Sequence, residues 1–385
     1  MEYRNFGRLD WKASALGFGC MRFPTADGNR MSPKIDQAEA TRMLRHAIDN
    51  GVNYVDTAYM YHGGASEKAV GIALGDGYRE RVKIATKLPV WMCDRPEDFD
   101  RLLGEQLERL ATDHVDFYLL HALGHERWQN RVLKHRLIEK AEEAKADGRI
   151  RALGFSFHDN HEAFEEILTG SDKWDFCQIQ LNYMDIANQA GIDGLKMAAD
   201  RGLAVVIMEP LMGGRLADPP TVIREVVEAH PSQRSSAAWA LEWLWNQPEV
   251  SVILSGMSTY EQVEENLATA SRARVGALSA EDEAFVGKLR TMYQERMKIP
   301  CTKCSYCMPC PNGINIPNNF EHYNYKFLYD DPQGANFRYN VFLTEEERSG
   351  ACIDCGVCLE QCPQQIAIPE RLKEVAEEIG APLGF

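Results

Sequence analysis

Cysteines are unevenly distributed in this chain, and their spacing is the strongest sign of chemistry in the sequence. Eight of the 11 cysteines fall in two short runs, CTKCSYCMPCP and CIDCGVCLEQCP. The eight are Cys301, Cys304, Cys307, Cys310, Cys352, Cys355, Cys358 and Cys362. The second run has the spacing C-x2-C-x2-C-x3-C-P, which is typical of thiolate ligands to a 4Fe–4S cluster. The first run is one residue shorter, and both continue alike (CPNGINIP and CPQQIAIP), so the repeat predicts two clusters.

Zinc sites and disulfides fit these crowded cysteines less well. Structural zinc needs only four ligands per ion and usually has its C-x2-C pairs further apart. Disulfide frameworks are typical of small secreted proteins rather than of a chain of 385 residues. The runs resemble those of bacterial two-cluster ferredoxins, in which the fourth cysteine of each run ligates the other cluster. The resemblance implies one cluster on Cys301, Cys304, Cys307 and Cys362, and another on Cys352, Cys355, Cys358 and Cys310.

Ionisable side chains also follow three consecutive β-type segments nearer the N-terminus. Asp56 ends one segment, with Tyr61 five residues further on, Lys87 ends the next segment, and His121 ends the third. Taken alone, each fits a simpler role, such as a helix cap, a solvated lysine or a core tyrosine. If the segments are parallel strands of a barrel, however, their carboxyl ends meet on one face and the four groups converge. Together they predict an acid–base site.

The elements that must position these groups follow from periodicity. From residue 15 to about residue 270, β-branched segments alternate with amphipathic helical windows. The expected strands are Ala15–Gly19, Asn53–Asp56, Val82–Thr86, Asp116–Leu120, Ile150–Phe155, Phe176–Leu181, Ala204–Met208 and Val252–Leu254. Eight strand–helix pairs over about 250 residues predict a closed (β/α)8 barrel. A doubly wound sheet is the alternative, but it would need a G-x-G-x-x-G motif where the sequence has GFGCMR.

We therefore expect an α/β protein with a TIM barrel in residues 1–275, a linker helix in 276–299 and a small iron–sulfur domain in 300–385. That last domain is expected to be ferredoxin-like and mostly helical. Ser279 and Asp282 have the spacing of a capping box at the start of the linker helix, and Pro300 ends it.

The motif D-T-A-x-x-Y, followed by G-x-S-E at Gly64–Glu67, resembles the aldo/keto reductase superfamily over roughly residues 3–275. The cysteine-rich tail resembles the ferredoxin-bearing branch of that superfamily. The resemblance implies that Tyr61 protonates a carbonyl oxygen, Lys87 lowers the pKa of Tyr61, Asp56 holds Lys87, and His121 positions the oxygen. It also implies hydride from NAD(P)H, held by Ser156, Gln178, Gly213, Gly214, Arg215, Gln262 and Asn266.

The sequence departs from the family pattern around the nicotinamide. Phe157 stands where the family has an asparagine, and Met208 stands where it has a tyrosine that stacks on the ring. Gly256 and Gln262 replace the basic residues that grip a 2′-phosphate, so no preference for NADPH is predicted. Nicotinamide also delivers two electrons whereas a cluster carries one, and no flavin motif is evident. The clusters are then structural, or connect the barrel to a redox partner, or reduce a barrel-bound compound directly.

Three functions remain open at this point. They are an NAD(P)-dependent reductase or dehydrogenase of an aldehyde, ketone or alcohol, an enzyme fed single electrons through its clusters, and an electron-transfer subunit with a docking barrel. The intact tetrad disfavours the last. A small-molecule carbonyl or alcohol is the expected substrate, and a ferredoxin or another redox protein is a candidate partner.

Composition indicates which partners and locations to expect. The net charge of -15 argues against nucleic acid as a partner. No apolar stretch is long enough to span a membrane, and the first residues lack the pattern of a signal peptide. We therefore expect a cytoplasmic protein that does not associate with membranes.

Overall fold

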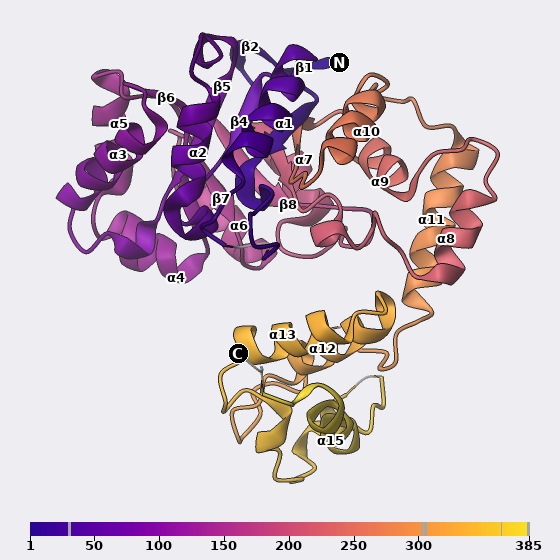
Figure 1. Cartoon of the computed structure of the whole chain (residues 1–385). Helices are drawn as coiled ribbons and strands as arrows, with labels where there is room; N and C mark the ends of the chain where they lie inside the picture. The colour runs from indigo at the N-terminus through magenta and orange to yellow at the C-terminus, as the bar shows by residue number, and fades with distance from the viewer. Residues whose placement is uncertain (30–31, 302, 304–305, 363, 383–385) are drawn as a thin grey trace. The chain divides into compact units, whose positions relative to one another are not determined.

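The computed structural model describes residues 1–29, 32–301, 303, 306–362 and 364–382. The chain forms two compact units (Figure 1). The first combines Met1–Ala217 with Ser235–Glu283, and the second combines Asp218–Arg234 with Ala284–Phe385. The division falls within helix α11 (Ala280–Gln294).

The first unit is built on a closed barrel of parallel strands in the order β10-β3-β4-β5-β6-β7-β8-β9. Runs such as AVVIM and VSVILS are mostly apolar because helices cover the barrel and its interior is packed. The predicted (β/α)8 barrel is therefore confirmed. The strands are β3 (Leu16–Gly19), β4 (Tyr54–Asp56), β5 (Lys83–Leu88), β6 (Val115–Leu123), β7 (Ile150–Phe157), β8 (Phe176–Gln180), β9 (Ala204–Met208) and β10 (Val250–Ser255).

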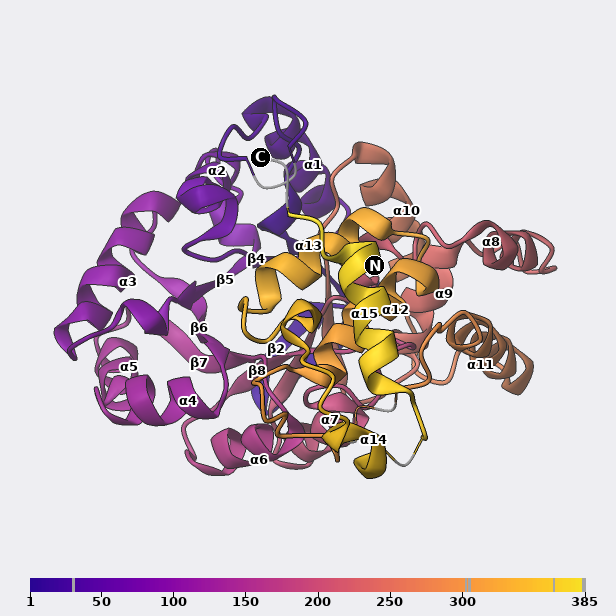
Figure 2. The ribbon, with the colours of Figure 1, turned by 90° about the horizontal axis from the view of Figure 1, so that it is seen from below.

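Helices surround the strands, as Figure 2 shows from below. Asp36, Asn160, Ser235 and Thr259 cap four of them by accepting a backbone N–H of the first turn. The main helices are α1 (Gln37–Asp49), α2 (Ala65–Ala73), α3 (Glu97–Leu110), α5 (Leu137–Ala146), α6 (His161–Thr169), α7 (Gly191–Asp200), α9 (Ser236–Trp245) and α10 (Tyr260–Ala270). A short α4 (His125–Arg127) and a π-helical segment (Trp128–Leu133) precede α5.

A β-hairpin, which the sequence patterns did not predict, closes the amino end of the barrel. It consists of β1 (Tyr3–Phe6) and β2 (Leu9–Ser14). Phe6 is fully buried, and its ring centroid lies 4.5 Å from that of Phe117 in the barrel interior. Gly7, between the strands, has φ +54° and so little space that an added Cβ would lie 2.3 Å from the Ala204 nitrogen.

The second unit is helical, as expected for the C-terminal region. It contains α8 (Thr221–Glu228), much of α11, α12 (Ile316–Leu328), α13 (Pro332–Phe342), α14 (Val357–Gln361) and α15 (Ile368–Ile379). The predicted capping box is present at the start of α11. The Asp282 N–H donates to Ser279 Oγ (3.1 Å), and the Ser279 N–H donates to Asp282 Oδ2 (3.2 Å).

The sequence repeat after each cysteine run has a structural counterpart. INIP and IAIP each lead into a helix with proline in its first turn, α12 and α15. The isoleucines of both motifs are buried.

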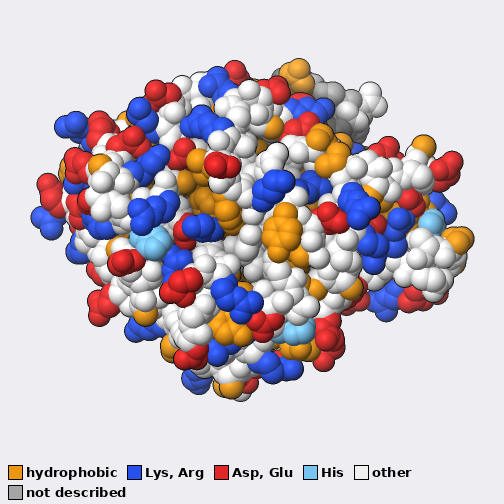
Figure 3. Space-filling model, turned by 90° about the horizontal axis from the view of Figure 1, so that it is seen from above, with side chains coloured by type: hydrophobic (Ala, Val, Ile, Leu, Met, Phe, Trp, Pro, Cys, Tyr) orange, Lys and Arg blue, Asp and Glu red, His pale blue; other side chains and the backbone are white. Residues whose placement is uncertain are grey.

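The surface of the molecule carries both signs of charge. Figure 3 shows acidic and basic side chains interspersed over one face of the molecule, although the net charge is -15. Within the described ranges, no helix combines the length and apolarity required for a membrane span.

Candidate functional site

Lys87 lies at the centre of the candidate site, on the barrel strand β5. Its ammonium donates hydrogen bonds to Asp56 Oδ1 (2.7 Å), to the Thr57 carbonyl (2.9 Å) and to the Tyr61 hydroxyl (3.1 Å). Only 1% of Lys87 and 2% of Asp56 is exposed. The second carboxylate oxygen of Asp56 is buried with no hydrogen-bond partner among the described residues. Three of the four predicted catalytic residues therefore form one hydrogen-bonded group, in which Lys87 and Asp56 are buried and Tyr61 is half-buried.

His121 lies beside this group. Strand β6 begins one residue earlier and ends three residues later than predicted, and its pairing with β7 becomes irregular after Leu120. Ala122 has φ +53°, which turns the backbone next to His121. The His121 ring meets the Tyr61 ring edge to face, with the centroids 6.3 Å apart. Its Nδ1 atom is buried and has no hydrogen-bond partner in the described part of the chain. The imidazole is therefore close to the phenol and has hydrogen-bonding capacity for a ligand.

Burial and charge set the protonation states. Burial raises the pKa of Tyr61, although the Lys87 ammonium opposes this effect. Burial acts to lower the pKa of Lys87, but the Asp56 carboxylate and Tyr61 outweigh it and the pKa is raised. Burial lowers the pKa of His121, and the cations of Lys87 and Arg127 lower it further. At neutral pH the site therefore has a protonated phenol, a charged lysine and a neutral imidazole.

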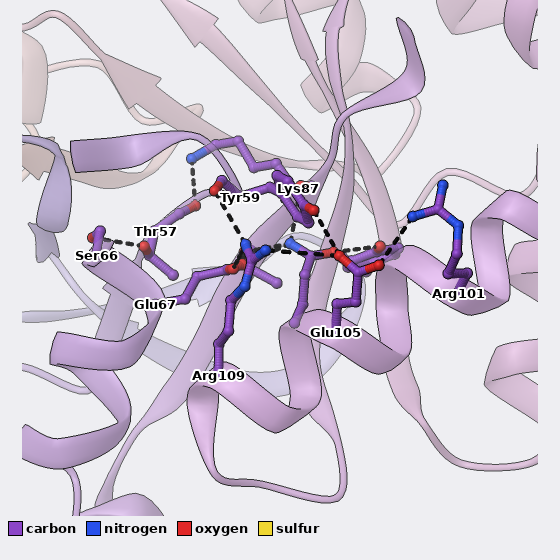
Figure 4. Close-up of polar contacts among 11 residues, drawn as sticks. Thr57, Tyr59, Ser66, Glu67, Lys87, Arg101, Glu105 and Arg109 are labelled. Atoms are coloured by element: carbon purple, nitrogen blue, oxygen red, sulfur yellow. Dashed lines mark hydrogen bonds and ion pairs between the residues drawn. The ribbon is translucent and has the colours of Figure 1, made fainter. Parts of the chain in front are cut away.

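A second polar network holds the strand that carries Lys87 (Figure 4). Glu67 is fully buried and accepts hydrogen bonds from the Thr86 hydroxyl and the Gln106 amide, both at 2.6 Å. Gln106 also donates to the Lys87 carbonyl (3.1 Å), which fixes the backbone at that residue. Arg109 pairs with Glu67 (3.3 Å) and supplies the counter-charge. Glu67 of the G-x-S-E motif is thus linked through Gln106 to the backbone of Lys87.

The residues expected to hold a nicotinamide ring lie at neighbouring strand ends. Ser156 on β7 accepts a hydrogen bond from the Ala122 N–H (2.7 Å). The Gln178 amide on β8 contacts the sulfur of Met208 (3.6 Å), and its buried Oε1 has no partner among the described residues. Phe157 packs on Phe164 of α6, with the ring centroids 5.1 Å apart, and so lies outside the barrel wall. Ser156 and Gln178 remain available to a ligand, and Phe157 does not face it.

The glycine loop after β9 is a basic cradle. An added Cβ on Gly213 (φ +69°) would lie 3.0 Å from Arg215 Nη1 and 3.2 Å from Arg22 Nη2. Gly214 has φ +104° and nothing within 4 Å of an added Cβ. The aliphatic part of the Arg22 side chain packs against Gly256. A Cβ added at Gly256 would lie 3.3 Å from Arg22 Cδ. Arg22 was missed in the sequence, and the glycine at 256 was the available signal because it leaves space for this arginine.

Gln262 and Asn266 lie on α10 and make contacts within the protein. Gln262 Oε1 accepts from the Ser258 N–H (2.8 Å), and Asn266 donates to the Ser255 hydroxyl (2.9 Å). The first hydrogen bond holds the loop after β10, and the second holds the last residue of that strand. These two residues therefore hold the end of β10, whereas Ser156 and Gln178 contact residues of β6 and β9.

In the second unit, the cysteine runs are anchored by asparagines of α12. Asn324 exchanges two hydrogen bonds with Ile299, two residues before Cys301 (2.7 and 2.8 Å). Ahead of the second run, the Asn319 amide donates to the Glu347 carbonyl and its oxygen accepts from the Ser349 N–H, both at 2.8 Å. One helix thus fixes the chain ahead of each run.

Seven of the eight cysteines in the two runs lie within the described residues. Burial raises the pKa of Cys358, and the nearby thiols of Cys352, Cys355 and Cys310 add to the shift while a backbone hydrogen bond opposes it. Cys310 of the first run is therefore near enough to Cys358 of the second run to influence its pKa. None of these seven cysteines forms a disulfide. The eighth, Cys304, lies outside the described residues. Within the described ranges, no group of three or more His, Cys, Asp or Glu is arranged to hold a single metal ion.

Fold and site together define an iron–sulfur oxidoreductase: a closed α/β barrel with a buried lysine–aspartate pair against a tyrosine, joined to a cysteine-rich helical unit. Residues 15–275 match the model of the aldo/keto reductase family, and residues 300–367 match a 4Fe-4S dicluster domain. The chain belongs to the aldo/keto reductase family and carries a dicluster domain after its barrel.

Similar proteins support this placement. YqkF of Bacillus subtilis, an uncharacterized oxidoreductase, is 26% identical over 305 residues, covering 71% of this chain and 93% of that protein. An NADH-specific methylglyoxal reductase of Escherichia coli is 26% identical over 313 residues, covering 68% and 91%. A Klebsiella pneumoniae aldo-keto reductase solved in complex with NADPH has a TM-score of 0.61 at 26% identity, covering 75% of this chain and 96% of that one.

Proposed function

We propose that the barrel reduces the carbonyl group of a small molecule, with Tyr61 as the proton donor and a nicotinamide as the hydride donor. The observation that carries this proposal is the position of Lys87 Nζ, 2.7 Å from Asp56 and 3.1 Å from the Tyr61 hydroxyl. A structural salt bridge between Lys87 and Asp56 would not need a phenol at hydrogen-bond distance from the lysine. A proton donor does, because its phenolate must be stabilised as the proton leaves.

The roles of the four residues follow from their protonation states. Tyr61 is protonated at neutral pH because burial raises its pKa, so it is ready to donate. Lys87 opposes that shift and stabilises the phenolate that forms, while Asp56 keeps the lysine charged. His121 is neutral because burial and nearby cations lower its pKa. A neutral imidazole donates a hydrogen bond to the carbonyl oxygen without competing as an acid.

A bound nicotinamide would supply the hydride. We assign its amide to Ser156 and Gln178, whose unpartnered Oε1 is buried. Its phosphates we assign to the cradle of Gly213, Gly214 and Arg215, with Arg22 as an added cation. The similar Klebsiella pneumoniae protein in complex with NADPH and the NADH-specific Escherichia coli relative support the assignment.

The dicluster domain adds a one-electron function to this barrel. We assign Cys352, Cys355, Cys358 and Cys310 to one cluster, and Cys301, Cys304, Cys307 and Cys362 to the other. The proximity of Cys310 to the second run supports the exchange of fourth ligands. The clusters would carry single electrons between the protein and a redox partner such as a ferredoxin.

A second candidate, an enzyme fed through its clusters without nicotinamide, is favoured by one observation. Met208, which contacts Gln178, occupies the position where the family has a tyrosine that stacks on the nicotinamide. The barrel therefore lacks this stacking interaction. Losing such a contact costs about 0.5–1.5 kcal/mol, which weakens cofactor binding without excluding it.

An anaerobic assay separates the two candidates. An aldehyde is incubated with the enzyme and NADH, NADPH or a chemical one-electron donor, while alcohol formation and cluster absorbance are followed. We expect alcohol to form when NADH or NADPH is present. We also expect neither nucleotide to reduce the clusters by itself, so that the cluster absorbance does not change. Alcohol formed only with the one-electron donor would overturn the nicotinamide route in favour of the second candidate.

A further inference from the structure

An indole ring connects the predicted proton-transfer site to a second cation. Trp91 lies in the turn after β5, and its ring centroid is 5.2 Å from that of His121. The guanidinium carbon of Arg127, from α4, lies 5.0 Å from the centroid of the same indole. Arg127 is therefore one aromatic ring away from the imidazole that faces Tyr61.

Arg127 has unusual partners for a partly buried arginine. It donates one hydrogen bond to the Ala122 carbonyl (2.7 Å) and stacks on Trp91. No acidic side chain in the described part of the chain forms an ion pair with it, whereas Arg131, a few residues on, pairs with Asp94. A guanidinium has five N–H donors, and one carbonyl uses only part of that capacity.

The charge balance around the site also differs from that of the protein. Lys87 is compensated by Asp56, so Arg127 contributes a net positive charge next to His121. The protein as a whole has a net charge of -15, which repels anionic small molecules. A cation held at the site is therefore selective for a ligand that carries its own negative charge.

We propose that Arg127 and Trp91 form a substrate subsite, and that the substrate is a carbonyl compound bearing a carboxylate about one ring's length from its carbonyl carbon. This deepens the proposed function and rests on it, since the carbonyl is placed at Tyr61 and His121. The planar guanidinium binds a carboxylate with two parallel hydrogen bonds, and the indole packs on the apolar part between the two groups.

The test uses two aldehydes of the same size, 4-formylbenzoate and its neutral counterpart 4-formylbenzamide. Their binding is measured by calorimetry with no electron donor present, and their kcat/KM values are then compared in turnover. We expect the binding constant and kcat/KM to be at least about tenfold higher for the benzoate than for the benzamide. This is the difference expected when a charge-assisted hydrogen bond replaces a neutral one.

Variants assign that preference to the guanidinium. In Arg127→Gln, the ratio of benzoate to benzamide is expected to fall close to one for both the binding constant and kcat/KM. Arg127→Lys is expected to retain part of the preference because it keeps the charge. Arg131→Gln, which removes a paired arginine from the same segment, is expected to keep the preference. Thermal denaturation checks that each variant is folded.

The outcomes separate this inference from the proposed function. Equal binding and equal kcat/KM for the two aldehydes in the native protein would overturn the subsite and leave carbonyl reduction standing. Arg127-dependent binding of the benzoate without turnover of either aldehyde would support the subsite and reject the proposed function. A preference that survives in Arg127→Gln would also overturn the subsite.

Discussion

Replacing Asp56 by asparagine tests whether the barrel chemistry depends on the buried ion pair. Lys87 Nζ and Asp56 Oδ1 are 2.7 Å apart, and their side chains are 1% and 3% exposed. Removing one partner of a buried pair leaves an uncompensated charge and typically costs about 3–5 kcal/mol. Lys87 reduces this cost by releasing its proton, because Asp56 is the main group that holds its pKa up against burial. The Tyr61 phenolate then loses its neighbouring cation.

We therefore expect two measurable changes in Asp56→Asn. The thermal midpoint falls, and carbonyl reduction slows by about a hundredfold or more, the range expected when acid catalysis is impaired. Denaturation is followed by circular dichroism, and turnover by alcohol formation.

Asp49→Asn is the matched control. The Arg81–Asp49 pair has the same 2.7 Å separation, but its side chains are 45% and 49% exposed. Its removal is expected to cost no more than about 1 kcal/mol and to leave turnover unchanged. Native stability and turnover in Asp56→Asn would refute this reasoning.

Three further predictions follow from the same structure. Gly7→Ala places a Cβ 2.3 Å from the Ala204 nitrogen at φ +54°, so we expect a lower thermal midpoint than for Gly28→Ala, where space is open; equal midpoints would contradict the close contact. Because reduction needs the protonated phenol and burial raises the pKa of Tyr61, the rate should fall only above that group's ordinary value near 10. A rate that already falls between pH 8 and 9 would contradict this. Anaerobically purified protein should contain about eight iron and eight sulfide atoms, and Cys310→Ala should lower the iron of the second run's cluster. Stoichiometric zinc with little iron, or loss confined to the first run's cluster, would overturn the ligand assignment.

Much of the barrel and the candidate site could be predicted because local patterns determine them. Apolar segments alternate with capped amphipathic helices, and parallel strands bring their carboxyl ends to one face. That rule alone groups Asp56, Lys87 and His121 at one end of the barrel. The Ser279 and Asp282 capping box was predictable for the same reason, since both partners lie within one helical turn.

Features that depend on distant contacts could not be predicted in this way. Arg22 approaches Gly213 only because the barrel closes and brings β3 beside β10. The N-terminal hairpin is short and mixed in polarity, and Phe6 becomes a core residue only once a barrel end is available for it. The contact between Arg127 and Trp91 joins two turns after different strands. Periodicity carries no information about such pairs.

The most direct test of the proposed chemistry is the comparison of Tyr61→Phe with Tyr59→Phe. Both tyrosines follow β4, but the Tyr59 hydroxyl donates to Glu105 (2.6 Å) whereas the Tyr61 hydroxyl accepts from Lys87 (3.1 Å). Aldehyde reduction is measured anaerobically for both, together with iron content and thermal midpoint. We predict that Tyr61→Phe keeps its iron and its fold but loses at least about a hundredfold in turnover, while Tyr59→Phe remains active. Turnover in Tyr61→Phe close to that of the native protein would contradict the role of Tyr61 as proton donor.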